Sequence, residues 1–249
     1  MAPNKSQNRA LGFCRACVFY LGFYLFTIVF VSTGVILFGL APYRIRGRYM
    51  VTWNFCMTHW LRLTCGVKFR VLGRDNLPPK KPYVIVANHQ SPWETYFLQY
   101  DLFPVCFVLK RELLRIPFFG WGLKMVKSIG IDRGNPRQAM RQTQEQGLER
   151  LREGINIVIF PEGTRKPPGE PGKFARGGAN LAVAGKVPLV PIALNAGEYW
   201  PAHKFLKQPG TITVSIGPAL TSNNGDSREL NQRAETWVAQ ELARIAAEQ

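Results

Sequence analysis

One histidine in the chain has a carboxylate at a spacing that suits proton transfer. His89 and Glu94 lie in residues 88–94, NHQSPWE, directly after the apolar run YVIVA. A histidine side chain exchanges protons near neutral pH, and a carboxylate that reaches back to it fixes its tautomer and raises its basicity. The pair predicts a general base that activates a hydroxyl of the substrate, so that no serine of the protein is acylated. Because such pairs also arise by chance on protein surfaces, the prediction depends on further segments.

Two further segments carry groups that suit a phosphate. Residues 160–165, FPEGTR, follow the run INIVI and combine a tight turn with the hydroxyl of Thr164 and the guanidinium of Arg165. Residues 131–134, IDRG, end another apolar run and supply Arg133. Arginine forks and the N–H groups of turns bind phosphate oxygens, although a single arginine is more often half of a surface ion pair. The two segments together predict an anion site if their arginines converge.

The elements that must position these residues alternate along the chain. Strand-like runs cover residues 67–73, 83–88, 105–109, 128–132, 155–160, 189–194 and 211–216, and helical patterns cover 93–101, 111–125, 137–153, 177–184 and 228–247. This alternation predicts an α/β fold with a single mixed, largely parallel sheet flanked by helices. The ends of parallel strands are where such sheets carry their active groups, and His89 follows a strand in this way.

The N-terminal region predicts a membrane anchor. Residues 16–43 contain no charged side chain, and this run is longer than the apolar core of a signal peptide, so we expect it to be retained as a membrane-inserted helical segment. A straight helix of this length would reach roughly 42 Å against about 30 Å of hydrocarbon. Basic residues flank both ends, so the positive-inside rule favours neither orientation. A re-entrant segment turning at residues 32–34 and a tilted single span are both open.

A second helical pattern follows the apolar segment. Met50, Trp53, Met57 and Leu61 recur at helical spacing and predict an amphipathic helix over residues 49–64. This helix could lie at the membrane interface or pack on the soluble part of the protein, and the sequence favours neither arrangement. We therefore expect residues 1–65 to form an N-terminal membrane anchor and residues 66–249 to form an α/β domain.

The composition restricts the possible partners. Lys and Arg outnumber Asp and Glu by 32 to 16, a formal net charge of +16, which attracts nucleic acid, anionic membrane lipids and phosphorylated substrates alike. No recognised nucleic-acid module is present, and such a function would leave the apolar N-terminus without a purpose. Five scattered cysteines indicate a reducing, cytoplasm-facing environment. We expect no metal site, and we expect His59 and His203 to be structural or surface residues, with His203 the better candidate to line a groove.

In this order, the segments resemble the motifs of the glycerolipid acyltransferase family, from about residue 82 to residue 218. NHQSPWE is similar to the first motif, a His and an Asp separated by four residues. FVLKREL-x-x-IPFFG with SIGIDRG is similar to the second region, FPEGTR to the third and VPLVPIAL to the fourth. Glu94 stands where the family more often has Asp, so its reach to His89 is one methylene longer.

The resemblance implies roles for individual residues. It implies that His89 is the general base and that Glu94 orients it. It places at the phosphate of the acceptor, or immediately around it, Arg133, Glu162, Gly163, Thr164 and Arg165. Lys110 is a weaker candidate for the electrostatics of the site. Pro191 belongs to a segment implied in acyl-donor binding or in site structure, with a plain strand-edge residue as the alternative.

The resemblance also implies a reaction. A fatty acyl group would pass from a thioester, acyl-CoA or acyl carrier protein, to the sn-2 hydroxyl of 1-acyl-glycerol-3-phosphate and give phosphatidic acid, with no acyl-enzyme and no cofactor. Another lysophospholipid or amphiphile would leave similar motifs, so the acceptor stays open. The catalytic domain is expected on the cytoplasmic face of a membrane, the inner membrane if the source is bacterial.

Two other functions are alternatives to acyl transfer. A catalytically silent lipid-binding protein would keep the fold for phosphate and membrane recognition, but the intact pair of His89 and Glu94 argues against it. A hydrolase of acyl thioesters would leave Arg133 and Arg165 without a purpose.

Overall fold

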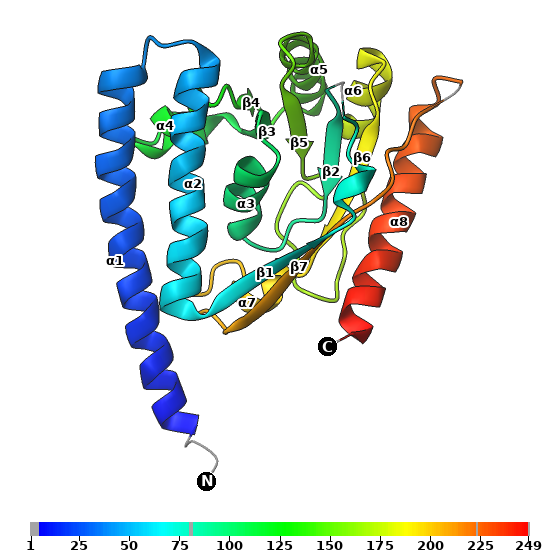
Figure 1. Cartoon of the computed structure of the whole chain (residues 1–249). Helices are drawn as coiled ribbons and strands as arrows, with labels where there is room; N and C mark the ends of the chain where they lie inside the picture. The colour runs from blue at the N-terminus through cyan, green and yellow to red at the C-terminus, as the bar shows by residue number, and fades with distance from the viewer. Residues whose placement is uncertain (1–4, 80–81, 223, 249) are drawn as a thin grey trace.

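The polar segments singled out above follow strands of one sheet. A computed structural model describes residues 5–79, 82–222 and 224–248. Within them, seven strands pair in the order β1-β7-β6-β2-β5-β3-β4, and all neighbours are parallel except β6 and β7. The strands are β1 (Val67–Leu72), β2 (Val84–Ala87), β3 (Val105–Lys110), β4 (Ile129–Ile131), β5 (Asn156–Ile159), β6 (Leu189–Leu194) and β7 (Gly210–Ile216). The predicted mixed, largely parallel sheet is confirmed (Figure 1).

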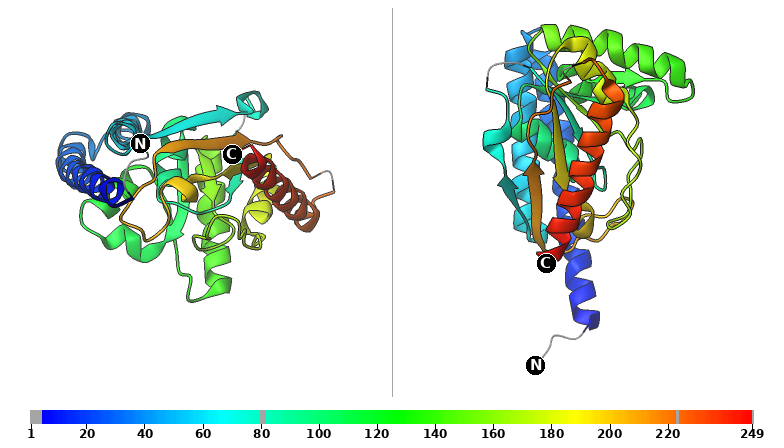
Figure 2. Two further views of the ribbon diagram at one scale, coloured as in Figure 1. Left: turned by 90° about the horizontal axis from the view of Figure 1, so that it is seen from below. Right: turned by 90° about the vertical axis from the view of Figure 1, so that its right-hand side faces the viewer.

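Helices cover both faces of this sheet. The α-helices are α1 (Lys5–Phe38), α2 (Tyr43–Cys65), α3 (Trp93–Asp101), α4 (Phe119–Met125), α5 (Pro136–Arg152), α6 (Gly177–Gly185), α7 (Ala196–Tyr199) and α8 (Ser227–Ala247). One core cluster joins α1, α2 and α3 to the sheet, and a second joins α5, α6 and α8 to it. The two groups of helices lie on opposite sides of the strands (Figure 2).

Alternation along the strands produces these two clusters. In β2, Ile85 and Ala87 belong to the first cluster, whereas Val84 and Val86 belong to the second. Successive side chains of a strand point to opposite faces, so a strand between two helical layers must be apolar at every position. All four residues of β2 are at most 1% exposed. The strand that leads to His89 is therefore held on both sides.

The N-terminal segment forms one continuous helix, so of the two arrangements left open by the sequence the one with a turn at residues 32–34 is wrong. Thr33 donates its hydroxyl to the carbonyl oxygen of Val29 at 2.8 Å within the helix. Gly34 allows α2 to approach closely, because a Cβ atom there would lie 2.6 Å from the ring of Tyr49. The chain reverses instead after Phe38, and α2 returns antiparallel to α1 (Figure 1).

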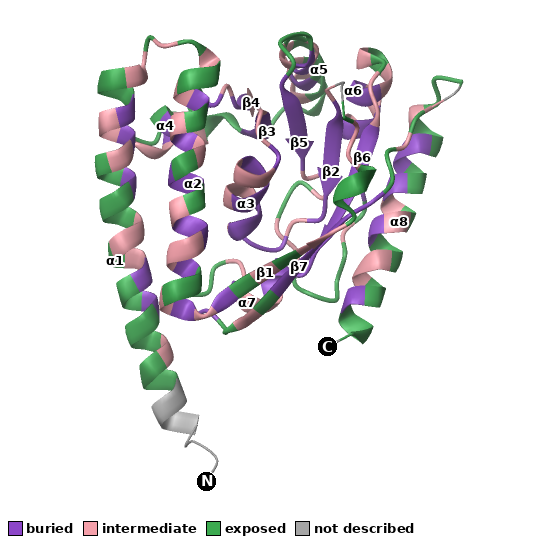
Figure 3. Ribbon diagram, viewed as in Figure 1, coloured by how far each residue is buried: buried purple, intermediate pink, exposed green. Residues whose placement is uncertain are grey.

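Much of α1 is uncovered by the rest of the protein. Its stretch Arg9–Phe38 is long and apolar enough to cross a membrane, and only 17% of its most apolar window is buried. A helix of a soluble core would be mostly buried, so this exposure is consistent with membrane association. Figure 3 shows exposed and half-buried residues along most of α1, and Figure 2 shows its N-terminal part projecting beyond the rest of the described chain.

The α2 helix packs on the protein through its apolar stripe. Met50, Trp53, Met57 and Leu61 are all at most 6% exposed and lie on the face toward α1 and α3. Of the two arrangements left open by the sequence, the structure shows that this stripe packs on the protein. The division into an anchor over residues 1–65 and a domain over residues 66–249 stays a prediction. Parts of both predicted regions lie outside the described residues, namely 1–4, 80–81, 223 and 249.

One predicted helix is wrong as a single element. Residues 111–125 divide into a 3-10 helix, η2 (Arg111–Arg115), and α4. The break occurs because proline disfavours the helical conformation of the residue before it. Ile116, which precedes Pro117, is extended with a ψ of 123°, and Phe118 has a φ of 58°. The short α7 and the 3-10 helix η1 (Arg74–Asn76) were not predicted.

The packing of α6 on β2 generates a first prediction. Gly178→Ala should destabilise the protein by about 1–3 kcal/mol, because a new Cβ atom would lie 2.5 Å from Cγ1 of Val86. Thermal unfolding of the full chain in detergent measures the change. Gly177→Ala is the matched control, since nothing lies within 4 Å of a Cβ atom there. Equal effects of the two substitutions would contradict this account of the packing.

Candidate active site

His89 and Glu94 form a hydrogen-bonded pair at the carboxyl end of β2. Nδ1 of His89 lies 2.5 Å from Oε2 of Glu94, and the carboxylate is completely buried. A carboxylate can only accept a hydrogen bond, so Nδ1 of His89 must carry the hydrogen. Nε2 of the neutral ring then has a lone pair that can accept a proton. This is the tautomer that a general base requires. The additional methylene of Glu94 does not prevent the contact.

The second oxygen of Glu94 holds the loop between β2 and α3. Oε1 accepts hydrogen bonds from the backbone N–H groups of Gln90 and Ser91, both at 2.9 Å. Ser91 in turn accepts the backbone N–H of Trp93, at 3.2 Å, through its hydroxyl oxygen. The carboxylate therefore orients the imidazole and the backbone that carries it at the same time.

Asn88 fixes the point at which the loop leaves the sheet. Its side-chain N–H₂ donates to the carbonyl oxygen of Leu194 at 2.8 Å, and its side-chain oxygen accepts the backbone N–H of Leu194 at 2.9 Å. The amide thus continues the ladder between β2 and β6 by one further pair, through a side chain that is 1% exposed. The motif NHQSPWE does not by itself indicate this role, because the partner of Asn88 lies 106 residues away along the chain.

The turn after β5 supports the histidine from its other side. The ring of Phe160 stacks on the ring of His89, with centroids 4.0 Å apart and planes 15° apart. Glu162 accepts the backbone N–H groups of His89 and Gly172, both at 2.8 Å. Burial raises the pKa of Glu162 above its ordinary value, although these two hydrogen bonds oppose the shift. As an acceptor, Glu162 holds the loops around the site together and is unsuited to bind a phosphate directly.

The two arginines of the predicted anion site line the same pocket. A guanidinium N–H of Arg133 donates to the carbonyl oxygen of Gly163, which connects the turn after β4 to the turn after β5. Arg165 is half-buried, and its Nε has no hydrogen-bond partner among the described residues. Thr164 is exposed on the same turn. A buried donor without a partner favours an anionic ligand at this position.

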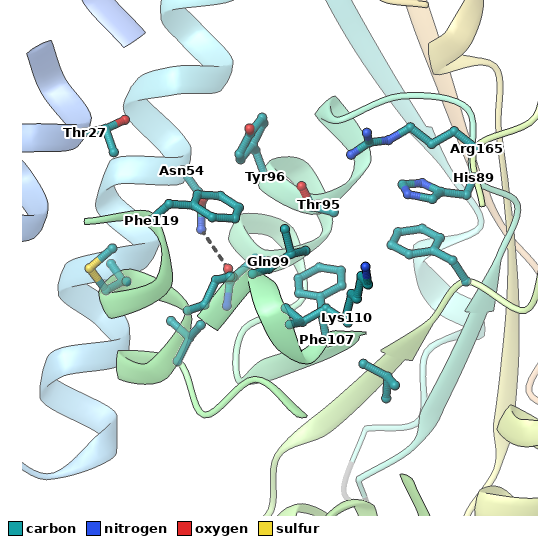
Figure 4. Close-up of a pocket in the computed structure, with 18 of the residues that line it drawn as sticks. Thr27, Asn54, His89, Thr95, Tyr96, Gln99, Phe107, Lys110, Phe119 and Arg165 are labelled. Carbon is teal, nitrogen blue, oxygen red and sulfur yellow. Dashed lines mark hydrogen bonds between the residues drawn. The ribbon is translucent and has the colours of Figure 1, made fainter. Parts of the chain in front are cut away.

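The pocket that contains these groups has a volume of about 370 Å³ and extends from the strand ends to the N-terminal helices. His89 and Arg165 lie side by side at one end, and Thr27 of α1 and Asn54 of α2 lie at the other (Figure 4). Apolar side chains line the space between them: Val31, Met50, Phe107, Leu113, Phe119, Leu123 and Val126. The pocket is therefore polar near the histidine and largely apolar beyond it.

The remaining candidates lie in different places. Lys110 lines the pocket but is about half exposed and lies 3.8 Å from Glu112. Pro191 is buried in β6 and is not among the lining residues, and it lies inside the sheet, so the strand-edge alternative is wrong. The carbonyl oxygen of Pro191 accepts the backbone N–H of Gly217, just past the end of β7. The sheet therefore tolerates a proline here, because its nitrogen, which has no hydrogen to donate, lies on this same side of the strand. His203 lines the pocket, as expected of the better groove candidate, and His59 does not.

The chain is similar over almost its whole length to known acyltransferases. A family model described as "Acyltransferase" matches residues 68–195. A 1-acyl-sn-glycerol-3-phosphate acyltransferase of Pseudomonas aeruginosa is 46% identical over 93% of this chain and 91% of its own length. One from Saccharomyces cerevisiae is 31% identical over 72% of this chain and 60% of its own length. The crystal structure of a 1-acyl-sn-glycerophosphate acyltransferase from Thermotoga maritima superimposes with a TM-score of 0.77 at 23% identity, over 94% of this chain and 95% of that chain. By the family model and the Pseudomonas relative, this chain belongs to the acyltransferase family.

Proposed function

We propose that this protein transfers a fatty acyl group from an acyl thioester to the sn-2 hydroxyl of 1-acyl-sn-glycerol-3-phosphate. One observation carries the proposal: a histidine oriented by a buried carboxylate opens onto a pocket that has arginines at one end and apolar walls beyond. The names of the relatives support the choice of acceptor. Other lysophospholipids share the same phosphate chemistry, and a panel of acceptors distinguishes them.

In the proposed reaction the histidine moves a single proton twice. Nε2 of His89 removes the proton of the acceptor hydroxyl as its oxygen attacks the thioester carbonyl carbon, and Glu94 stabilises the resulting imidazolium. The carbon–sulfur bond then breaks, and the leaving thiolate takes the proton from the imidazolium. The products are an ester and a free thiol. The acyl group passes directly between substrates, and the reaction needs no cofactor beyond the thioester.

The two ends of the pocket suit the two parts of a lipid substrate. Arg133, Arg165 and the hydroxyl of Thr164 are donors for phosphate oxygens, with Lys110 adding positive charge at the mouth. The apolar end is lined by α1, α2 and α4 and offers a place for a hydrocarbon chain. Because α1 is both a pocket wall and the candidate membrane helix, the site lies next to the lipid phase that contains its acceptor.

The proposal also covers the thioester donor and the side of the membrane on which the catalytic domain lies. Acyl-CoA and acyl carrier protein are anionic, and a formal net charge of +16 attracts both of them as well as anionic lipid headgroups. These donors are cytoplasmic, so the catalytic domain faces the cytoplasm, on the inner membrane in a bacterium. Nucleic acid has no part in this function.

Removal of the proposed base tests the reaction. His89→Ala should lower turnover by about 10²- to 10⁴-fold, while the variant stays folded and bound to membranes. The measurement is transfer of a labelled acyl group by purified protein to a panel of lysolipids. His59→Ala is the control, because this half-buried histidine does not line the pocket, and its hydrogen bond is to the carbonyl oxygen of Phe55 in its own helix. Undiminished turnover in His89→Ala would refute the mechanism.

Removal of the arginines tests the phosphate assignment. Arg133→Ala and Arg165→Ala should each raise KM for the acceptor by about tenfold or more, since each would lose a charge-assisted hydrogen bond, and should leave KM for the donor nearly unchanged. Arg141→Ala is a matched control, because Arg141 is exposed on α5, lies outside the pocket and pairs with Glu145 of its own helix. Equal increases for both substrates would refute the assignment.

A further inference from the structure

The segment between α7 and β7 connects the membrane helix to the pocket. This segment, residues 200–209, packs on α1 at two places and presents one side chain, His203, to the pocket between them. Among the described residues, no other residue after β6 lines the pocket. His203 belongs to none of the motifs that identify the family, and the mechanism above does not use it.

The backbone of His203 has a left-handed conformation. Its φ is 61°, in the left-handed region that non-glycine residues rarely adopt. His203 is the third residue of a turn, in which the backbone N–H of Lys204 donates to the carbonyl oxygen of Pro201 at 3.3 Å. A left-handed backbone at a residue other than glycine is common at ligand sites, where it aims a side chain that another conformation would direct elsewhere.

Two contacts hold the segment that carries this turn against α1. Trp200, at one end of the segment, is 5% exposed and packs edge-on against Phe19 of α1, with ring centroids 5.1 Å apart. Near the other end, Nζ of Lys207 lies 3.5 Å from the centroid of the Tyr20 ring and donates to the carbonyl oxygen of Phe205 at 2.8 Å. Burial lowers the pKa of Lys207 to about 8. The chain between these contacts is held against the membrane helix.

The charge of the pocket indicates what His203 faces. The described lining includes Lys110, Arg133 and Arg165 but no aspartate or glutamate. An imidazole keeps at least one N–H group in either protonation state, so it can donate a hydrogen bond to an anion at any pH near neutrality. A donor at the mouth of a pocket with cationic groups and no carboxylate is suited to the oxygens of an anionic headgroup.

We propose that His203 is a further substrate-binding residue, which donates a hydrogen bond to a phosphate oxygen of the lysolipid acceptor. The assignment rests on the proposed function for the identity of the acceptor. The packing of Trp200 and Lys207 on α1 positions the imidazole, so the helix that reaches the membrane also orients one of the groups that hold the headgroup.

Equilibrium binding tests this contact without turnover. In a His89→Ala background, His203→Gly should weaken binding of 1-acyl-glycerol-3-phosphate by about tenfold or more and binding of 1-acylglycerol, which lacks the phosphate, by less than about twofold. Glycine adopts a positive φ without strain, so the loop is preserved. His203→Asn, which tolerates the left-handed conformation and keeps an N–H donor, should recover most of the affinity.

The outcomes separate this inference from the reaction. Equal losses for the two lipids, or a loss below about twofold for the phosphorylated one, would overturn the role of His203. If the parent chain transfers no acyl group to any lysolipid, yet the binding difference is observed, the proposed reaction fails and the His203 contact stands. In active protein, His203→Gly should raise KM for the acceptor and leave kcat and KM for the donor nearly unchanged.

Discussion

The carboxylate of Glu94 has no exposed surface, and the geometry of the site depends on how that buried charge is compensated. Removal of a carboxylate from water costs on the order of several kcal/mol unless donors surround it. Here two backbone N–H groups bond one oxygen, and the imidazole of His89 bonds the other. The loop must adopt the one path that supplies these three donors, and the histidine is consequently aimed at the pocket.

The sequence predicted what depends on local pattern. Strands buried on both faces read as continuous apolar runs, and the polar residues that follow them were expected at one edge of the sheet, where His89, Arg133 and Arg165 are found to line one pocket. The sequence also contains a signal for the helix break in residues 111–125, because Pro117 disfavours a helical backbone at the residue before it. The helical spacing of the residues around Pro117 hides the break.

Contacts between distant residues could not be predicted. Nothing near Asn88 indicates that its amide pairs with Leu194, and nothing near Gly34 indicates that it allows the ring of Tyr49 to approach. A serine, threonine and glycine in succession suggest a turn, yet in this apolar helix the hydroxyl of Thr33 bonds back to the helix and Gly34 admits a neighbouring helix. The packing of Trp200 on Phe19 of α1 is likewise a contact that the loop sequence does not reveal.

The shared wall between α1 and the pocket has a practical consequence for preparing the enzyme. A chain shortened to begin at α2 would be a tempting soluble version, because it lacks the most apolar helix. It would also lose Thr27 and Val31 from the pocket and uncover Trp200, which now packs on Phe19. Solubility gained in this way would come from dismantling the substrate site, so extraction of the whole chain with detergent is the sounder route to active material.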